Sequence, residues 1–386
     1  QRQLRSLLRA MNLKNLKYLI PLFFILLGID YIYSPNVWDT FRMGKIRFLF
    51  IAAVSYLFIK LKKHTNSLGL SLFISWMWLM WIAMNYAVRN EVKIGNGMIS
   101  ILQSNSVMLP LCSTAVVILA WEICKVAKEK VGTWIMWFGV IEAAHCWMQM
   151  LGVPTFVNPK EPWFINMPLG TQGQPTFLGP FLVACLAPAL WKKKYELCLF
   201  MLVPIIGTLS TMTYASLACL LFLYSLTLFN KKTLIMGYSV AAIILTLFAF
   251  NYKKSEFLST NYRIPVWGLA LKNISIFGGG PDYWTGTVSF SKEAKAATWN
   301  GLRPERIHSE PLEVLVDFGW VGFLICLYAL YEFFRRFKLS WEHATVCSIL
   351  VNSLANFPLH IVSISVLVMI SLVYSMQYNS EGDKNE

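Results

Sequence analysis

Long apolar stretches recur along the chain and are separated by polar connections, most of them short. Most stretches have roughly 17 to 22 residues, enough for a helix to cross a hydrocarbon layer about 30 Å thick. We therefore expect an all-α polytopic membrane protein with a single transmembrane domain over residues 1–386. The pattern predicts twelve spans, at residues 16–34, 46–60, 68–87, 106–124, 131–151, 174–191, 195–210, 212–229, 233–251, 311–334, 342–357 and 358–377.

Two connections, residues 152–173 and 252–310, are much longer than the rest. Long connections in a compact bundle are more often functional than decorative, because ordering them costs entropy. Within the larger one, "RIPVWGLALKNISIF" spaces its apolar residues as in a short helix at the membrane interface. The "GGGPDYW" that follows ends this helix and permits a tight turn.

Composition and charge fit the same picture. Of the residues, 56% are hydrophobic and only 14% are charged, as expected for a protein surrounded by lipid. The net charge of +14 does not indicate a nucleic-acid partner, because the basic residues cluster between spans, on alternating sides. More than half lie on one face, which the positive-inside rule makes cytoplasmic, together with both termini. The apolar run near the N-terminus lacks a small-residue cleavage site and predicts an uncleaved helix.

The sequence contains no recognisable metal or cofactor motif. The eight cysteines lie in or beside predicted spans without a CxxC pair, so neither a disulfide framework nor a zinc site is implied. Phosphate-loop, dinucleotide-binding, HExxH and GxSxG signatures are also missing. We therefore expect no bound metal and no cofactor.

His308 is the candidate for proton transfer. It stands where the tenth predicted span begins, with Ser309 as a helix N-cap and Pro311 in the first turn. An ordinary pKa near 6.5 suits histidine to accept a proton at neutral pH, and the positive end of the helix favours the neutral form. The alternative is an interfacial histidine that only hydrogen-bonds a loop.

The same predicted span carries two further features. Gly319 and Gly322 form a GxxG pair that would let another helix backbone approach closely. Glu313 and Asp317, one turn apart, should face the bundle interior or a wet cavity, where they would pair with an arginine or contact a substrate.

Polar residues also form stripes in two other predicted spans. They are Glu142, His145 and Gln149 in one, and Asn352 and Asn356, just before His360, in the other. Such stripes line a pocket or join helices by hydrogen bonds. A proton relay through Glu142 and His145 would suit a transporter, although no internal repeat supports that class.

The 252–310 connection is rich in basic residues, although the positive-inside rule depletes its side of them. A negatively charged ligand at the membrane surface would explain the arginines, because a guanidinium matches phosphate oxygens in a two-pronged fashion. We favour this role over simple headgroup contact for Arg263, whereas the lysines are expected to be solvated.

Three passages resemble the O-antigen ligase and O-antigen polymerase superfamily of bacterial membrane glycosyltransferases. "HSEPLEVLVDFGWVG" is similar to that family's histidine motif, with His308, Ser309, Gly319 and Gly322 in place. "RIPVWGLALKNISIFGGGPDYW" resembles its Arg–Trp segment with a Gly-rich turn, through Arg263, Trp267, Gly278 and Gly280. "GTQGQPTFLGPFLV" is similar to its "QPN" passage, with Gln174 and Pro175 kept and Thr176 replacing Asn.

The resemblance implies a GT-C-like bundle with a large periplasmic catalytic loop, residues 252–310, between helices 9 and 10. It further implies metal-independent, inverting transfer of a glycan from an undecaprenyl-diphosphate carrier to an acceptor sugar hydroxyl, at the periplasmic face of the bacterial inner membrane. His308 would act as the base and Arg263 would bind the diphosphate, while Trp267, Gln174, Tyr214 and Ser309 would contact substrate. The arginine of the family's "SR" pair is replaced by Tyr214, so Arg303 or Arg306 would supply the second cation.

Two alternatives remain open within and outside this family. A ligase transfers the glycan to the lipid A core, whereas a polymerase joins lipid-linked repeat units, and the residues do not separate these acceptors. A transporter of polysaccharide or lipid-linked glycan is the alternative that is not an enzyme.

Overall fold

The computed structural model describes residues 117, 120–121, 123–125, 127, 130–153, 167–228, 263–280, 283–297, 304, 306–335 and 337–382. Its regular elements are all helices, and these residues contain no strand. The spans predicted at 16–34, 46–60, 68–87 and 233–251 lie outside the described residues, as does most of 106–124 and as does Arg303.

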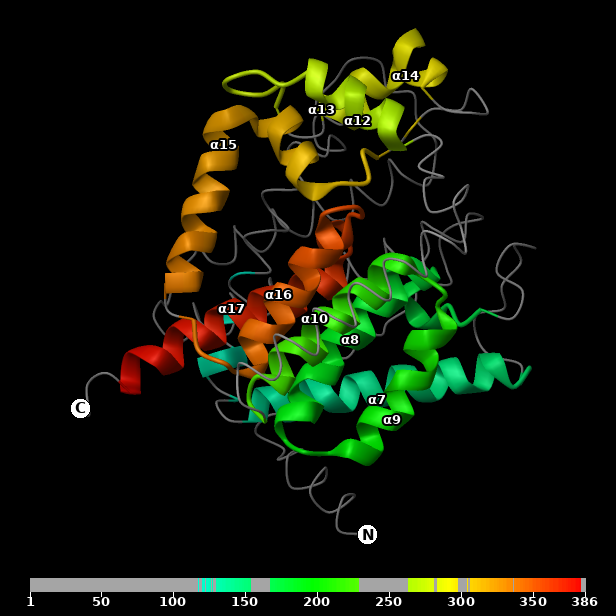
Figure 1. Cartoon of the computed structure of the whole chain (residues 1–386), viewed down its shortest axis with the longest axis vertical. Coiled ribbons are helices and arrows are strands. Elements are labelled where there is room, and N and C mark those ends of the chain that lie inside the picture. Colours follow the sequence, from blue (N-terminus) through cyan, green and yellow to red (C-terminus); the bar gives the residue numbers. More distant parts are fainter. Residues whose placement is uncertain are drawn as a thin grey trace, which may run out of the picture.

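The helical bundle makes up the lower part of the molecule in Figure 1. Within the described residues it consists of α7 (Val131–Met150), α8 (Pro175–Trp191), α9 (Tyr195–Gly207), α10 (Thr211–Ser225), α16 (Trp341–Ser353) and α17 (Val362–Gly382). Two short 3-10 turns, η3 (Gly170–Gln172) and η5 (Pro358–His360), precede α8 and α17. These helices occupy the ranges predicted for spans five to eight, eleven and twelve, apart from a few residues at their ends.

Helix α8 is the centre of the bundle. It packs against α7, α9, α10, α16 and α17. Because it is apolar on every face, almost all of its side chains are buried. Gly179 lets α10 approach closely, since a Cβ at this position would collide with the side chain of Thr213.

The polar stripes predicted in the bundle join helices and turns. Glu142 is fully buried and accepts hydrogen bonds from the Thr171 backbone at 2.6 Å and from the Thr171 hydroxyl, which fixes η3 against α7. The amide of Asn352, in α16, donates to the Ser216 hydroxyl of α10 at 3.2 Å. The amide of Asn356, just after α16, donates to the Asn352 side chain at 3.2 Å. These bonds favour the helix-joining role over the pocket.

The loop unit is a second compact body, at the upper end of Figure 1. We use this name for α12 (Arg263–Lys272), α13 (Tyr283–Gly286), η4 (Val288–Phe290), α14 (Lys292–Ala296), Pro304 and residues 306–318. Its own small apolar core contains Val266, Ala270, Trp284, Val288, Ile307 and Val316. The short helix predicted over "RIPVWGLALKNISIF" is confirmed as α12 for residues 263–272, but it ends before Asn273, and the residues up to Phe277 belong to the turn that follows.

Helix α15 (Glu310–Arg335) leads from the loop unit down one side of the molecule (Figure 1). At its lower end, Phe333 is buried and stacks on His343 of α16 with ring centroids 4.6 Å apart. Between its two ends the helix exposes apolar side chains, including Leu324, Ile325 and Tyr328, which are 59%, 64% and 65% exposed.

The predicted length of the spans is only partly confirmed. Among the described helices, α15 alone is both long and apolar enough to cross a membrane. Helices α9 and α16 have 13 residues each, which corresponds to about 20 Å of a roughly 30 Å hydrocarbon layer. Hydropathy did not reveal where these helices end. Thr208 and Leu209 close α9, with Leu209 at a positive φ of 50°, and a turn before Pro358 closes α16.

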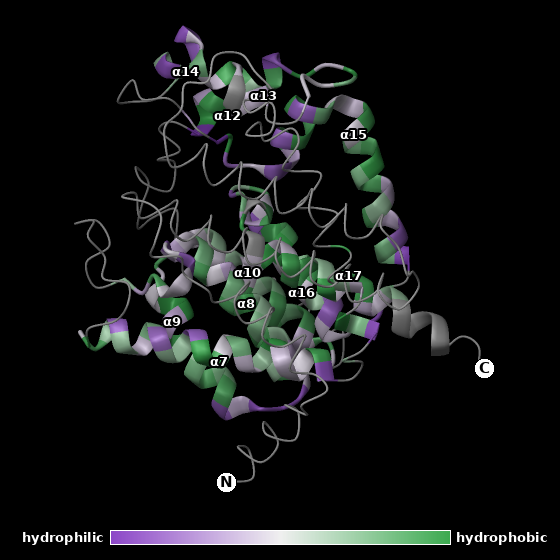
Figure 2. Cartoon of the chain, turned by 180° about the vertical axis from the view of Figure 1, so that it is seen from behind, coloured by the Kyte–Doolittle hydropathy of each residue, from purple (hydrophilic) through white to green (hydrophobic). Residues whose placement is uncertain are grey.

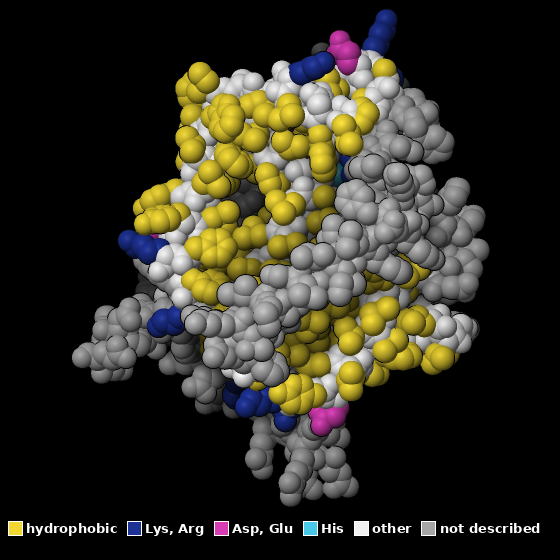
Figure 3. Space-filling model, viewed as in Figure 1, with side chains coloured by type: hydrophobic (Ala, Val, Ile, Leu, Met, Phe, Trp, Pro, Cys, Tyr) yellow, Lys and Arg dark blue, Asp and Glu magenta, His cyan; other side chains and the backbone are white. Residues whose placement is uncertain are grey.

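Hydropathy follows this division of the molecule. The bundle helices and α15 are mainly hydrophobic, whereas hydrophilic residues gather on the loop unit and at helix ends (Figure 2). On the face shown in Figure 3, hydrophobic side chains cover most of the described surface, and charged side chains lie at the upper end, along the left edge and at the lower end. A hollow with a hydrophobic rim opens on that face, between the loop unit and the bundle.

Candidate active site

His308 lies immediately before α15, as the sequence predicted. The helix begins at Glu310, and the carbonyl of Ser309 accepts its first hydrogen bond, from the Glu313 N–H at 3.0 Å. His308 has a positive φ of 59°, a left-handed conformation that costs a residue with a Cβ roughly 1 kcal/mol or more. The surrounding contacts therefore hold His308 in a backbone conformation that it would not adopt by itself.

Helix α12 holds the chain just before His308. The indole Nε1–H of Trp267 donates to the carbonyl of Ile307 at 2.9 Å, and Ile307 itself is fully buried in the core of the loop unit. Trp267 thus fixes the backbone next to the histidine. This is a positioning contact, in addition to any contact of Trp267 with substrate.

Two arginines act on His308 electrostatically. Burial lowers the pKa of His308, and the positive charges of Arg263 and Arg306 act in the same direction, so that together they bring it to about 4. Arg263 comes from the first turn of α12 and Arg306 from the segment before α15. The fold therefore brings Arg263 of α12 to the segment that carries both Arg306 and the predicted base, His308.

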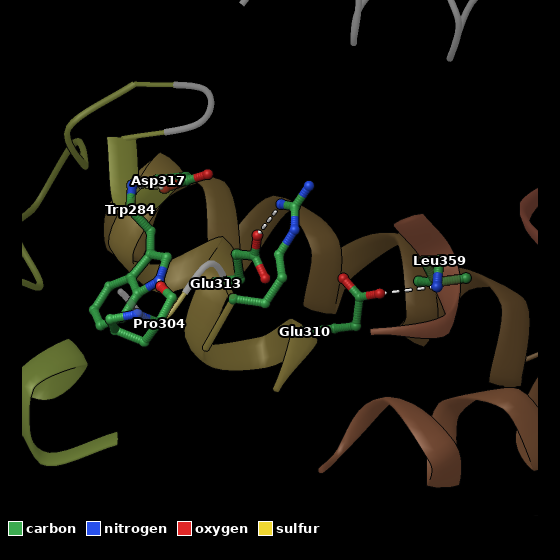
Figure 4. Close-up of polar contacts among 7 residues, drawn as sticks. Trp284, Pro304, Glu310, Glu313, Asp317 and Leu359 are labelled. Atoms are coloured by element: carbon green, nitrogen blue, oxygen red, sulfur yellow. Dashed lines mark hydrogen bonds and ion pairs between the residues drawn. The ribbon is translucent and has the colours of Figure 1, made fainter. Parts of the chain in front are cut away.

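Three carboxylates on α15 bond three different segments (Figure 4). Glu313, only 4% exposed, forms an ion pair of 2.7 Å with the guanidinium of Arg306. The Asp317 carboxylate accepts a hydrogen bond from the backbone N–H of Trp284 at 3.0 Å. The Glu310 carboxylate accepts one from the backbone N–H of Leu359 at 2.8 Å. Of the two roles considered for Glu313, pairing with an arginine is the one observed.

The Glu310 contact brings the turn between α16 and α17 to the histidine. Phe357, in this turn, packs edge-on against the His308 ring with centroids 5.1 Å apart. Phe357 also packs edge-on against Phe177 of α8, with ring centroids 5.3 Å apart. Gln174 precedes Phe177 by three residues, so the "QPT" passage reaches the histidine region through two aromatic rings.

The Gly-rich turn and the GxxG pair meet at a break in α15. Gly319 has φ 69° and ψ −170°, which interrupts the helix, and Gly278 lies against it with φ 75°. A Cβ on Gly278 would collide with the backbone of Asp317, and a Cβ on Gly319 would collide with the backbone of Gly278. The expectation that Gly319 admits another helix is thus corrected: the backbone it admits is that of a turn.

Four backbone hydrogen bonds pair this turn with the break. An unbroken helix would use the N–H groups of residues 320 and 321 for the carbonyls of residues 316 and 317. Here the two sets of groups bond the turn instead, through Gly279 N–H to Val316 O (3.1 Å), Gly280 N–H to Asp317 O (2.8 Å), Trp320 N–H to Ser275 O (3.2 Å) and Val321 N–H to Ile276 O (3.1 Å).

The remaining predicted residues fall outside this group. The Tyr214 hydroxyl donates to the carbonyl of Ile206 in α9 at 2.6 Å, so it serves the connection between α9 and α10. Gly322 leaves room for the side chain of Phe318 on its own helix. Arg303 is not among the described residues, so its role stays a prediction.

Sequence reasoning did not identify Glu310, Phe357 and Trp284 as part of this region. The spacing of Glu310 with Glu313 and Asp317, three and seven residues apart, was the available signal, because it places three acidic groups along one helix face. For Phe357 and Trp284 the sequence offered none, since their role depends on which segments meet.

The arrangement combines a histidine that is neutral at pH 7 with cationic groups beside it. Such a site can accept a proton from a hydroxyl while arginine binds an anionic leaving group. Among the described residues, no cluster of three or more His, Cys, Asp or Glu could hold a metal ion.

The comparison with protein families connects this geometry to a known group. Curated proteins and solved structures gave no match. A family model described as O-antigen ligase matches residues 197–327, about a third of the chain, a range that includes Arg263, Arg306, His308 and the α15 break. The resemblance inferred from the sequence is confirmed over residues 197–327, which match the O-antigen ligase family of membrane-embedded glycosyltransferases.

Proposed function

We propose that this protein transfers a glycan from an undecaprenyl-diphosphate carrier to a sugar hydroxyl of the lipid A core, at the periplasmic face of the bacterial inner membrane. The observation that carries the proposal is the group formed by His308, Arg263 and Arg306, within a range that matches the O-antigen ligase family. The hydrophobic hollow in Figure 3 supports lateral entry of a lipid tail between the loop unit and the bundle.

His308 accepts the proton of the acceptor hydroxyl while its oxygen attacks the anomeric carbon of the donor sugar. The bond between that carbon and the diphosphate oxygen breaks, so the product has inverted configuration and the diphosphate stays on the carrier. Arg263 and Arg306 stabilise the charge that develops on the leaving diphosphate.

Binding of the donor also improves the base. With a pKa of about 4, His308 is neutral at pH 7 but attracts protons weakly. A bound diphosphate offsets the two guanidinium charges that lower this pKa, so the pKa rises toward its ordinary value once the donor is in place.

Reconstitution tests the reaction and its acceptor together. Purified protein in vesicles would receive an undecaprenyl-diphosphate-linked oligosaccharide with either lipid A core or further lipid-linked repeat units as acceptor. Carrier release with glycan on the core supports the ligase. Chains that lengthen on the carrier would instead identify an O-antigen polymerase, and transport without glycosidic bond formation would refute both.

His308→Ala tests the proposed base. General-base assistance is worth about 100- to 10,000-fold in rate, so transfer should fall by that order. Lys272→Ala, at the exposed end of α12, is the matched control and should transfer normally. Wild-type rates in a correctly folded His308→Ala protein would remove His308 from the mechanism.

A further inference from the structure

The Gly-rich turn at residues 275–280 presents apolar side chains on an ordered backbone. Ile276 is 64% exposed and Phe277 is 77% exposed. The four backbone hydrogen bonds to α15, together with a bond from Gly278 N–H to the Ser275 hydroxyl at 2.9 Å, hold the turn in place. These two side chains therefore project from a fixed support.

The apolar surface of the turn continues that of α15. Trp320 and Val321, whose N–H groups bond the turn, are themselves 50% and 41% exposed. No charged residue occurs from Asn273 to Gly280. The exposed surface of the membrane-length helix thus extends over the turn without a charged residue in between, and the exposed Ser275 uses its hydroxyl to bond the Gly278 N–H.

Helix length places the break at membrane depth. From Trp320 to Arg335 the helix measures about 24 Å at 1.5 Å per residue, less than a hydrocarbon layer of roughly 30 Å. Arg335 and Lys338 fix the cytoplasmic end, because basic residues gather on that side. The opposite end of this stretch, at Gly319, therefore does not reach beyond the acyl chains.

A helix break at that depth needs partners for its backbone. Unpaired N–H and C=O groups facing acyl chains are strongly unfavourable, since no water is present to bond them. Residues 275–280 provide those partners for both sides of the break. The same turn then shields the break from lipid with Ile276 and Phe277.

We propose that residues 275–280 form a re-entrant turn inside the outer leaflet, where Ile276 and Phe277 contact the acyl chains of bilayer lipids. This part of the 252–310 connection is then membrane-embedded, and α15 crosses the membrane as a helix completed by a turn. The proposal requires α15 to span the bilayer, but it does not depend on glycan transfer.

Photocrosslinking in vesicles tests the contact directly. p-Benzoylphenylalanine would replace Phe277 or, in a second protein, Ile276, with the full chain in phosphatidylethanolamine and phosphatidylglycerol vesicles whose acyl chains carry an alkyne tag. The same probe at Tyr328 of α15 provides the lipid-facing reference. The probe at Phe290, which is 56% exposed in the loop unit and borders the charged α14, provides the matched aqueous control.

Lipid labelling at positions 277 and 276 should approach that at 328 and exceed that at 290 several-fold. Because the vesicles contain no undecaprenyl carrier, this signal reports bilayer lipid and is independent of donor binding. Labelling at the level of position 290 would overturn the proposal, as would crosslinks to another copy of the chain. An unlabelled position 328 would overturn it as well, by removing α15 from the bilayer.

Discussion

At the scale of single residues, His308 owes its properties to neighbours from three segments. Burial, Arg263 and Arg306 lower its pKa, while Phe357 packs on its ring. A lone imidazole in water would titrate near 6.5. The contacts shift that titration far enough to change the pH at which the residue can serve as a base.

The pH dependence of transfer should reflect this shift. Protonation of His308 removes the base, so kcat/KM, which reports the free enzyme, should fall only as the pH drops through about 4. Arg263→Gln removes one of the charges that lower the pKa and should move this acidic limb to higher pH. Lys272→Gln serves as the control, and an acidic limb near 6.5 in the unmodified protein would contradict the assignment.

Variants of the ion pair between Arg306 and Glu313 can distinguish a structural role of Arg306 from a role in binding the diphosphate. Glu313→Ala leaves a largely buried guanidinium without its carboxylate and should destabilise the protein by roughly 3 kcal/mol. Arg306→Met combined with Glu313→Leu removes both charges and should recover most of that loss. If Arg306 also binds the diphosphate, the double variant stays weak in transfer, with an increased KM for the donor.

Thermal unfolding in detergent and initial rates at varied donor concentration measure the two effects. Recovery of both stability and donor KM in the double variant would show that the pair is structural only. The sequence predicted Arg306 as a candidate cation and Glu313 as a residue facing the interior. It did not indicate that they pair, because a seven-residue separation across a helix start does not determine a distance.

At the scale of elements, the break in α15 is the feature least visible in the sequence. Hydropathy predicted one span at 311–334, and the Gly319–Gly322 spacing indicated close helix packing. A sequence does not display φ angles, and the partner turn lies some forty residues earlier. The family pattern contained both the turn and the GxxG pair without indicating that they touch.

Glycine substitutions should therefore differ in effect according to position. Gly319→Ala and Gly278→Ala place a Cβ against backbone at positive φ, so both should lower the melting temperature or prevent folding. Gly268→Ala is the matched control, because its helical position has open space and alanine favours helix by about 1 kcal/mol. Thermal unfolding of the purified variants decides, and equal melting temperatures for all three would contradict the observed break.

At the scale of the whole molecule, the site depends on contact between the loop unit and the bundle. Sequence patterns predicted both bodies: a helical bundle and a long functional connection with a helix at its start. Sequence patterns did not predict the contacts that join the two bodies. These are the hydrogen bond between Glu310 and Leu359 and the ring contacts of Phe357 with His308 and Phe177. These contacts link residues that are about 50 to 180 positions apart, and local periodicity does not indicate contacts over such separations.

Phe357, which belongs to the bundle, should hold the His308 ring in the position needed for catalysis. Phe357→Ala removes the ring that packs on His308 and should lower kcat by about 10- to 100-fold through misplacement of the base. The donor KM should change little, because Arg263 and Arg306 belong to the loop unit. Phe357→Tyr keeps the ring and should retain most of the rate, whereas a purely structural role would be satisfied equally by Phe357→Leu.

Rate measurements on these variants, with Phe290→Ala as control, distinguish the two roles. A low donor affinity with unchanged kcat in Phe357→Ala would instead place Phe357 with the groups that bind the donor.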